Sequence, residues 1–264
     1  MIMLQQHVVI DNYKIRYLTG GNSRYPLILL HGLGASAERW DPIIPLLKKH
    51  FNLIIPDIIG FGYSDKPAVD YTMGFFVNFV KKFLDQLGIS KTHVMGSSMG
   101  AQISAEFTLV NNDRVNKLVL VSPTGTATSM SSTLDRYVMA ALYPSNDYVT
   151  DAFDFIGMIP EDNPQQFIDD FVQRMKLPNA KLAFLSTILG LKDSSNIRDR
   201  LHRIKVPTML IWGGKDMMIP ETHSKYFISR IPDCNYLHMP ESGHTPFTEY
   251  PEAFCRHVKK FFGV

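Results

Sequence analysis

The stretch Gly96-Ser97-Ser98-Met99-Gly100 follows a short apolar run, 92–95, and precedes a helix-like stretch, 101–110. At this point the chain must reverse sharply from a buried strand into a helix, and Ser98 lies at the tip of the turn. A serine hydroxyl is a useful nucleophile only when it is held out of the backbone, beside a base and near a helix N-terminus. The pattern therefore predicts a strand–turn–helix whose turn carries a nucleophile.

Short apolar runs recur on both sides of this turn, and helical stretches separate most of them. The runs are 27–30, 53–55, 93–95, 118–121 and 209–212, and the helical spacing is clearest over 40–50 and 75–87. Nearly continuous apolar runs are typical of parallel strands buried on both faces. We expect an α/β fold with a mostly parallel, eight-stranded sheet covered by helices on both faces. An antiparallel pair, 7–10 and 14–18, is expected at one edge.

The alternation of strands and helices stops after Thr126 and resumes at about Lys205. No strand-like run lies between these points, and prolines punctuate the segment at intervals suited to helix ends. The helical stretches expected there are 129–143, 147–158, 164–176, 180–191 and 195–204. We therefore expect residues 126–205 to form a helical cap, inserted into a core domain made of residues 1–125 and 206–264.

A serine nucleophile needs a base, and the base needs an acid that orients it and stabilises its charged form. Asp216 follows the buried run 209–212 and is expected at the same edge of the sheet as Ser98. His244 lies in a loop after the last expected strand, 236–238, and before a final helix. The candidate catalytic residues are therefore Ser98, Asp216 and His244, in this order along the chain.

Acyl transfer also needs hydrogen-bond donors for the oxygen that becomes negative, and each contributes about 3 kcal/mol. The segment His31-Gly32-Leu33-Gly34 follows the buried run 27–30, and its backbone can turn the Leu33 amide toward the site. The Met99 amide, at the start of the helix after Ser98, is the second expected donor. We expect the His31 ring to brace this loop by hydrogen bonds rather than to act in catalysis.

Together these segments resemble the α/β-hydrolase superfamily over almost the whole length of the chain. The matching residues are His31-Gly32-Leu33-Gly34, 57–62 with Ser64-Asp65-Lys66-Pro67, 96–100, 212–216 and Gly243-His244. The resemblance implies an α/β-hydrolase fold and a serine carboxylesterase-like enzyme with a helical cap, related to C–C bond hydrolases. The order serine, acid, histidine is also that of the family. The sequence departs from the family at Ile59, where a larger polar residue is usual, and at Ser97, where His or Asn is frequent.

The composition argues against several other classes of function. Among 264 residues, 27 are basic and 25 acidic, which gives a net charge of +2 without a block of like charge, so nucleic acid is not an expected partner.

We see neither a secretory signal nor a run long enough to span a membrane, and we expect a cytoplasmic location. Cys234 and Cys255 lack the spacing of a metal site, and the triad requires no metal or organic cofactor. The oligomeric state stays open between monomer and homodimer.

The expected substrate is a small-molecule carboxylic ester with small to medium apolar groups, because the cap is rich in apolar side chains. Nothing in the cap sequence indicates a fixed cationic clamp for a carboxylate. The residues expected to contact the substrate are Gly32, Gly34, Ser97, Met217, Thr245, Met130 and Tyr137.

Two alternatives to an esterase remain open. A C–C bond hydrolase that cleaves ring-fission products uses the same triad. Some relatives with this fold keep the triad and serve mainly as ligand-binding receptors with slow hydrolysis. Epoxide hydrolases and haloalkane dehalogenases attack with a carboxylate, whereas position 98 is a serine, so these two activities are disfavoured.

Overall fold

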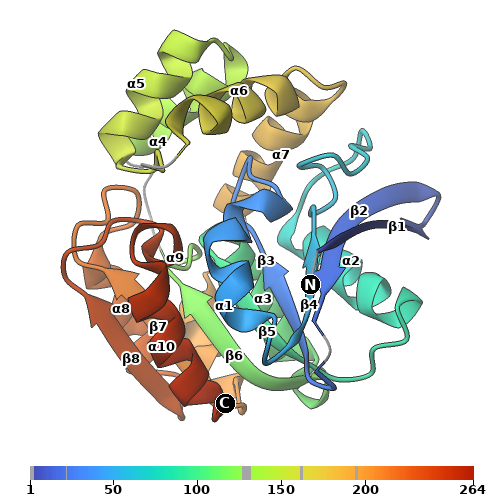
Figure 1. The fold of residues 1–264 in the computed structure, drawn as a ribbon, viewed down its shortest axis with the longest axis vertical. Helices are drawn as coiled ribbons and strands as arrows, with labels where there is room; N and C mark the ends of the chain where they lie inside the picture. The colour runs from blue at the N-terminus through green and yellow to red at the C-terminus, as the bar shows by residue number, and fades with distance from the viewer. Residues whose placement is uncertain (1–2, 22, 127–131, 161–162, 194–195) are drawn as a thin grey trace.

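The computed structural model describes residues 3–21, 23–126, 132–160, 163–193 and 196–264. Its centre is an eight-stranded sheet in the order β1-β2-β4-β3-β5-β6-β7-β8 (Figure 1). The strands are β1 (Leu4–Ile10), β2 (Tyr13–Gly20), β3 (Pro26–Leu30), β4 (Asn52–Pro56), β5 (Thr92–Ser97), β6 (Val115–Val121), β7 (Thr208–Gly213) and β8 (Cys234–Met239). The pairs β1–β2 and β2–β4 are antiparallel and the other pairs are parallel, so the expected mostly parallel sheet is confirmed.

Helices cover both faces of this sheet. The face packed by α2 (Met73–Gln86), α3 (Met99–Val110) and α8 (Ser224–Ile228) is opposite the face packed by α1 (Ile44–Leu47) and α10 (Pro251–Phe262). The short elements are the 3-10 helices η1 (Ala37–Ile43), η2 (Asn112–Arg114), η3 (Ile197–Arg203) and η4 (Glu221–His223), and the one-turn helix α9 (Pro246–Glu249).

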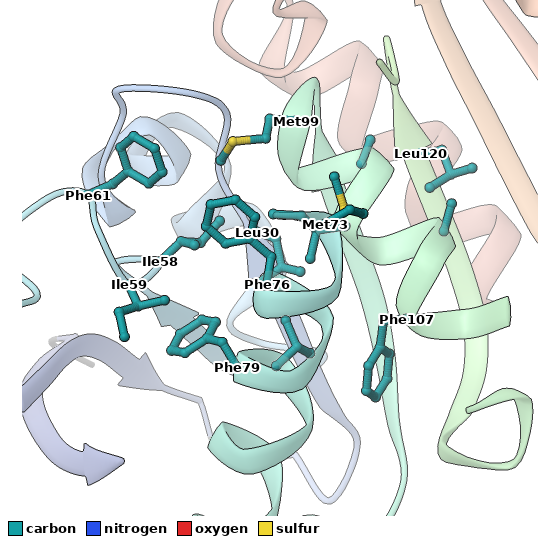
Figure 2. Close-up of a cluster of buried hydrophobic side chains, with 14 of the residues drawn as sticks. Leu30, Ile58, Ile59, Phe61, Met73, Phe76, Phe79, Met99, Phe107 and Leu120 are labelled. Carbon is teal, nitrogen blue, oxygen red and sulfur yellow. The ribbon is translucent and has the colours of Figure 1, made fainter. Parts of the chain in front are cut away.

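The side chains of the continuous apolar strands belong to two separate hydrophobic cores. Along β3, Ile28 and Leu30 belong to the core under α2 and α3, whereas Leu27 and Leu29 belong to the core under α10. This division follows from the two-residue period of a strand, which points successive side chains to opposite faces. Figure 2 shows the first core, where phenylalanines of α2 and α3 gather around side chains from the strands. Burial on both faces explains why the strands carry no alternating pattern.

A helical insertion separates β6 from β7. It contains α4 (Ser132–Leu142), α5 (Asn146–Ile156), α6 (Pro164–Met175) and α7 (Ala180–Asp193), which we call the inserted helices. In Figure 1, α4, α5 and α6 lie together above one end of the sheet, and α7 descends from them toward it. Within the described residues, no helix combines the length and apolarity needed to cross a lipid bilayer.

Two helical expectations need correction. The stretch 40–50 is a 3-10 helix followed by a single α-helical turn, because Pro42 and Pro45 lack the N–H groups that a continuous α-helix requires. The stretch 195–204 forms the 3-10 helix η3 over Ile197–Arg203 rather than an α-helix, and residues 194–195 lie outside the described ranges. The expected residues 129–131 at the start of α4 also lie outside them.

Candidate active site

Ser98 lies at a sharp turn between β5 and α3. Its φ of 56° and ψ of −119° are strained for a residue with a side chain, and the turn is fixed by hydrogen bonds from Ala101 N and Gln102 N to its carbonyl oxygen. Gly100 makes the turn possible, because a Cβ atom there would lie 2.1 Å from Leu30 O. The helix must therefore start directly against the end of β3, with Ser98 half-buried at its N-cap.

Asp216 and His244 form a buried pair on two neighbouring loops, after β7 and β8. His244 Nδ1 donates a hydrogen bond of 2.8 Å to Asp216 Oδ2, and His244 is only 3% exposed. The other carboxylate oxygen, Oδ1, accepts from the backbone amides of Met218 and Ile219, both at 2.9 Å. The carboxylate is thus held by three donors, and the bond to Nδ1 leaves Nε2 of His244 as the proton acceptor of the ring.

The backbone around His244 is fixed by a residue that the sequence analysis missed. Glu249, in α9, accepts from Gly243 N at 2.6 Å and from Thr245 N at 3.0 Å. One carboxylate therefore binds the peptide groups on both sides of His244. In the sequence, Glu249 is a single acidic residue in a short helical stretch. Nothing there distinguishes it from a solvent-exposed glutamate.

The two expected donors for an oxyanion belong to segments that adjoin Ser98. Met99 is the first residue of α3, so its N–H has no acceptor within the helix. The loop of Gly32 and Leu33 packs directly on Ser98, since a Cβ atom at Gly32 would lie 3.3 Å from Ser98 Cβ. Both Leu33 and Met99 line the same cavity as Ser98.

His31 braces this loop from beneath. Its Nδ1 hydrogen-bonds Gly32 O at 2.8 Å, and its Nε2 accepts from Ile58 N at 3.0 Å. The ring is fully buried, and this burial lowers its pKa, so the neutral tautomer that serves both partners is favoured. The bracing role expected of His31 agrees with these contacts.

A cavity of about 920 Å³ joins the candidate groups under the inserted helices. Ser98 and His244 line it, and so do most of the residues expected to contact a substrate, namely Gly32, Gly34, Ser97, Thr245 and Tyr137. The inserted helices and the loop after α5 supply an apolar wall that consists of Leu134, Tyr137, Phe153, Met158, Phe167, Phe171, Ile188 and Leu191. Such a cavity suits an apolar small molecule. No group of three His, Cys, Asp or Glu side chains within the described ranges is placed to hold a metal ion.

One expected contact residue, Met217, is not brought to this cavity. Met217 is 52% exposed, and its neighbours Met218 and Ile219 line the cavity instead. The bonds from the amides of Met218 and Ile219 to Asp216 set this local orientation. Met130 lies outside the described residues.

Two arginines also line the cavity, and one of them, Arg174, comes from the inserted segment, where no fixed cationic clamp was expected. Arg174, on α6, is 7% exposed, and within the described residues its Nε has no hydrogen-bond partner. Arg39, in η1, lines the same cavity, and burial lowers its pKa to about 10, with a further contribution from the charge of Arg174. At a pKa of about 10, Arg39 remains charged at neutral pH. An isolated arginine in a sequence gives no signal for such a site, because most arginines are solvated.

Comparison with known proteins agrees with this architecture. Residues 25–155 match the family model described as the alpha/beta hydrolase fold. The chain is 30% identical to a 2-hydroxy-6-oxononadienedioate/2-hydroxy-6-oxononatrienedioate hydrolase of Comamonas testosteroni, over 94% of this chain and 90% of that protein. It is 29% identical to Lipase 1 of Psychrobacter immobilis, over 95% and 81% of the two chains. The solved 2-hydroxy-6-oxo-6-phenylhexa-2,4-dienoate hydrolase of Rhodococcus sp. strain RHA1 superposes with a TM-score of 0.86 at 20% identity, covering 100% of this chain and 99% of that one.

Proposed function

Because this chain belongs to the α/β-hydrolase fold family, we propose that it is a serine hydrolase that cleaves carboxylic esters of small to medium apolar substrates. One observation carries the proposal. A serine at a strained strand–helix turn and a buried histidine–carboxylate pair, which come from three separate loops, open into one largely apolar cavity. Groups in this combination perform nucleophilic acyl transfer on many unrelated chains.

The reaction follows from the roles of the three side chains. His244 Nε2 takes the proton of Ser98, and Ser98 Oγ attacks the ester carbonyl to form a tetrahedral intermediate. The amides of Leu33 and Met99 donate to the oxyanion, while Asp216 stabilises the imidazolium. The imidazolium then gives its proton to the departing alkoxide, which leaves the acyl group on Ser98. A water molecule, deprotonated by His244, releases the acid and restores the hydroxyl.

We further propose that residues 126–205 act as a cap over this site. The inserted helices supply the apolar wall of the cavity, so the chemistry takes place where bulk water is partly excluded. Excluding water strengthens the electrostatic interactions of the oxyanion donors and of the Asp216–His244 pair.

Turnover of p-nitrophenyl esters from acetate to laurate tests the proposal. We expect hydrolysis by the wild type, with a maximum at the acyl length that fills the cavity, and loss of turnover in Ser98→Ala. Ser90→Ala is the matched control, because Ser90 is an exposed serine just before β5 that does not line the cavity. Retained turnover in Ser98→Ala would refute the proposed nucleophile.

A second candidate, a C–C bond hydrolase acting on a vinylogous diketo acid, is favoured by the arginines of the cavity. Arg174 and Arg39 place two positive charges in one partly apolar site, and an anionic group on the substrate would compensate them. The relative from Comamonas testosteroni is named for hydrolysis of such acids. If this candidate holds, Arg174→Gln raises KM for the acid by about 10- to 100-fold, the value of a hydrogen bond to a charged group, and leaves KM for a neutral ester within about twofold. An equal effect on both substrates would argue against it.

A further inference from the structure

Arg39 is the residue at which the core, the inserted helices and the loop of His244 meet. Its Nη2 donates to Met158 O, in the segment between α5 and α6, at 3.1 Å, and to Thr245 Oγ1 at 3.0 Å. The guanidinium carbon also lies 4.9 Å from the centre of the Phe167 ring, on α6. One side chain of the core thus contacts the inserted helices on one side and the neighbour of His244 on the other.

The partners of Arg39 make these contacts sensitive to position. Within the described part of the chain, Arg39 forms no ion pair with a carboxylate, and its hydrogen bonds to Met158 O and Thr245 Oγ1 go to neutral oxygens. The negative charge of Glu249 raises the pKa of Arg39 and so favours its charged form. A half-buried cation held by neutral acceptors depends on the geometry of each bond, because no strong ion pair replaces a bond that is lost.

A short path leads from Arg39 to the imidazole. Thr245 Oγ1 accepts from Arg39 and also from Thr248 Oγ1, at 2.8 Å. The amide of Thr245 donates to Glu249, which holds the Gly243 amide on the other side of His244. A displacement of Thr245 therefore moves the backbone that carries His244. A misplacement of about 1 Å at a reacting group costs about 100-fold in rate.

We propose that Arg39 is a positioning residue that couples the docking of the inserted helices to the placement of His244. When the segment of Met158 and the ring of Phe167 are in place, Arg39 holds Thr245 and so holds the imidazole toward Ser98. When they move away, the loop loses this support and the base is misplaced. The inference rests on the proposed hydrolase function, since the placement of His244 matters only if it is the base.

A double-mutant cycle on the bond between Arg39 and Thr245 tests the coupling. We compare Arg39→Gln, Thr245→Val and the double variant by kcat and KM on a neutral p-nitrophenyl ester and by the labelling rate with an uncharged fluorophosphonate. Each single variant is expected to lose about 10- to 100-fold in kcat and in labelling rate, with KM nearly unchanged. The double variant is expected to be no slower than the slower single variant, because both changes break one bond. Thr245→Ser keeps the accepting hydroxyl and is expected to retain the wild-type rate.

Two other roles for Arg39 give different results. If it binds a substrate anion directly, Arg39→Gln changes KM for anionic substrates only and leaves neutral labelling at the wild-type rate. If it merely stabilises the packing, Tm falls while kcat, measured well below Tm, is retained. Either result overturns the coupling, and so do additive losses in the double variant. Thr245→Val removes the acceptor of the same hydrogen bond, so the coupling can still be tested if Arg39→Gln does not fold.

Arg136→Gln is the matched control. Arg136, on α4, also stacks on a phenylalanine, with its guanidinium carbon 4.3 Å from the Phe155 ring centre, and it pairs with Asp151. It is exposed and does not line the cavity, so we expect kcat within about twofold of the wild type. If the wild-type protein is not labelled at all, the hydrolase proposal fails and the coupling fails with it. If the wild type is labelled and Arg39→Gln is labelled equally fast, only the coupling fails.

Discussion

Tyr137 donates a hydrogen bond of 2.5 Å from its hydroxyl to the carbonyl oxygen of Leu33. The two residues are far apart in the sequence, since Tyr137 lies on α4 and Leu33 in the loop after β3. The Tyr137 ring is fixed by Phe153, Phe171 and Phe184, whose ring centres lie 5.2 to 5.8 Å away. The inserted helices therefore contact the loop that we propose to carry an oxyanion donor.

Tyr137→Phe tests this contact. The variant keeps the ring and its packing but leaves Leu33 O without this donor, at a cost of about 1 kcal/mol in the placement of the loop. We expect kcat for a p-nitrophenyl ester to fall about fivefold, with little change in KM. Tyr143→Phe, at an exposed tyrosine just after α4, is the control. If Tyr137→Phe has the kcat of the wild type, the contact does not support the oxyanion loop.

Asp216→Asn probes the buried pair. The amide places an N–H₂ group or a weak acceptor against His244 Nδ1, so the ring tends to adopt the wrong tautomer for accepting the Ser98 proton. We expect kcat to fall by about 10,000-fold while the fold is retained, as judged by circular dichroism. Glu241→Gln is the matched control, because Glu241 lies exposed on the loop before His244 and pairs with Lys215. If kcat of Asp216→Asn falls by less than tenfold, Asp216 does not take part in the reaction.

Gly100→Ala tests the turn itself. The new Cβ would lie 2.1 Å from Leu30 O and 2.4 Å from His31 O, both backbone atoms that cannot move without shifting β3. We expect a loss of several kcal/mol in the free energy of unfolding, or no folded protein. Gly74→Ala is the control, since Gly74 lies near the start of α2, where a Cβ atom would be no closer than 3.9 Å to its nearest neighbour, Thr72 Oγ1. Alanine there stabilises a helix by up to about 1 kcal/mol. Urea unfolding of both variants measures their free energies of unfolding. A Gly100→Ala protein as stable as the wild type would contradict the requirement for glycine at this turn.

The burial of His93 makes the free energy of unfolding depend on pH in mild acid. Its ring packs between Phe51 and Phe262, and burial lowers its pKa from 6.5 to about 4. Between these two values the unfolded chain binds a proton that the folded chain does not, so this group makes the free energy of unfolding fall as the pH falls from 6.5 to 4.

The variant His93→Phe keeps an aromatic ring and removes the titrating group. We expect its free energy of unfolding to decline less than that of the wild type between pH 6.5 and pH 4, as measured by urea titrations. His257→Phe changes an exposed histidine on α10 and serves as the control. An identical pH dependence in His93→Phe and the wild type would contradict the assignment.

Local patterns in the sequence predicted the sheet and most of the candidate site. Ser98, Asp216 and the loop of Leu33 each follow a strand buried on both faces, so the carboxyl edge of a parallel sheet gathers them. Arg39 could not be predicted in the same way, because its bond to Thr245 joins residues 206 positions apart and depends on how the inserted helices dock. Met217 was misplaced by one residue, since the bonds of the next two amides to Asp216 decide which side chains face the cavity.

We propose that Ser98, His244 and Asp216 act as one proton relay. The most direct measurement is labelling by a fluorophosphonate, with the modified residue located by peptide mass spectrometry, in the wild type and in His244→Ala. We expect one label, on Ser98, and a labelling rate in His244→Ala at least about 1,000-fold lower, because the hydroxyl has lost its base. A label on any other residue, or labelling of Ser98 in His244→Ala at the wild-type rate, would contradict it.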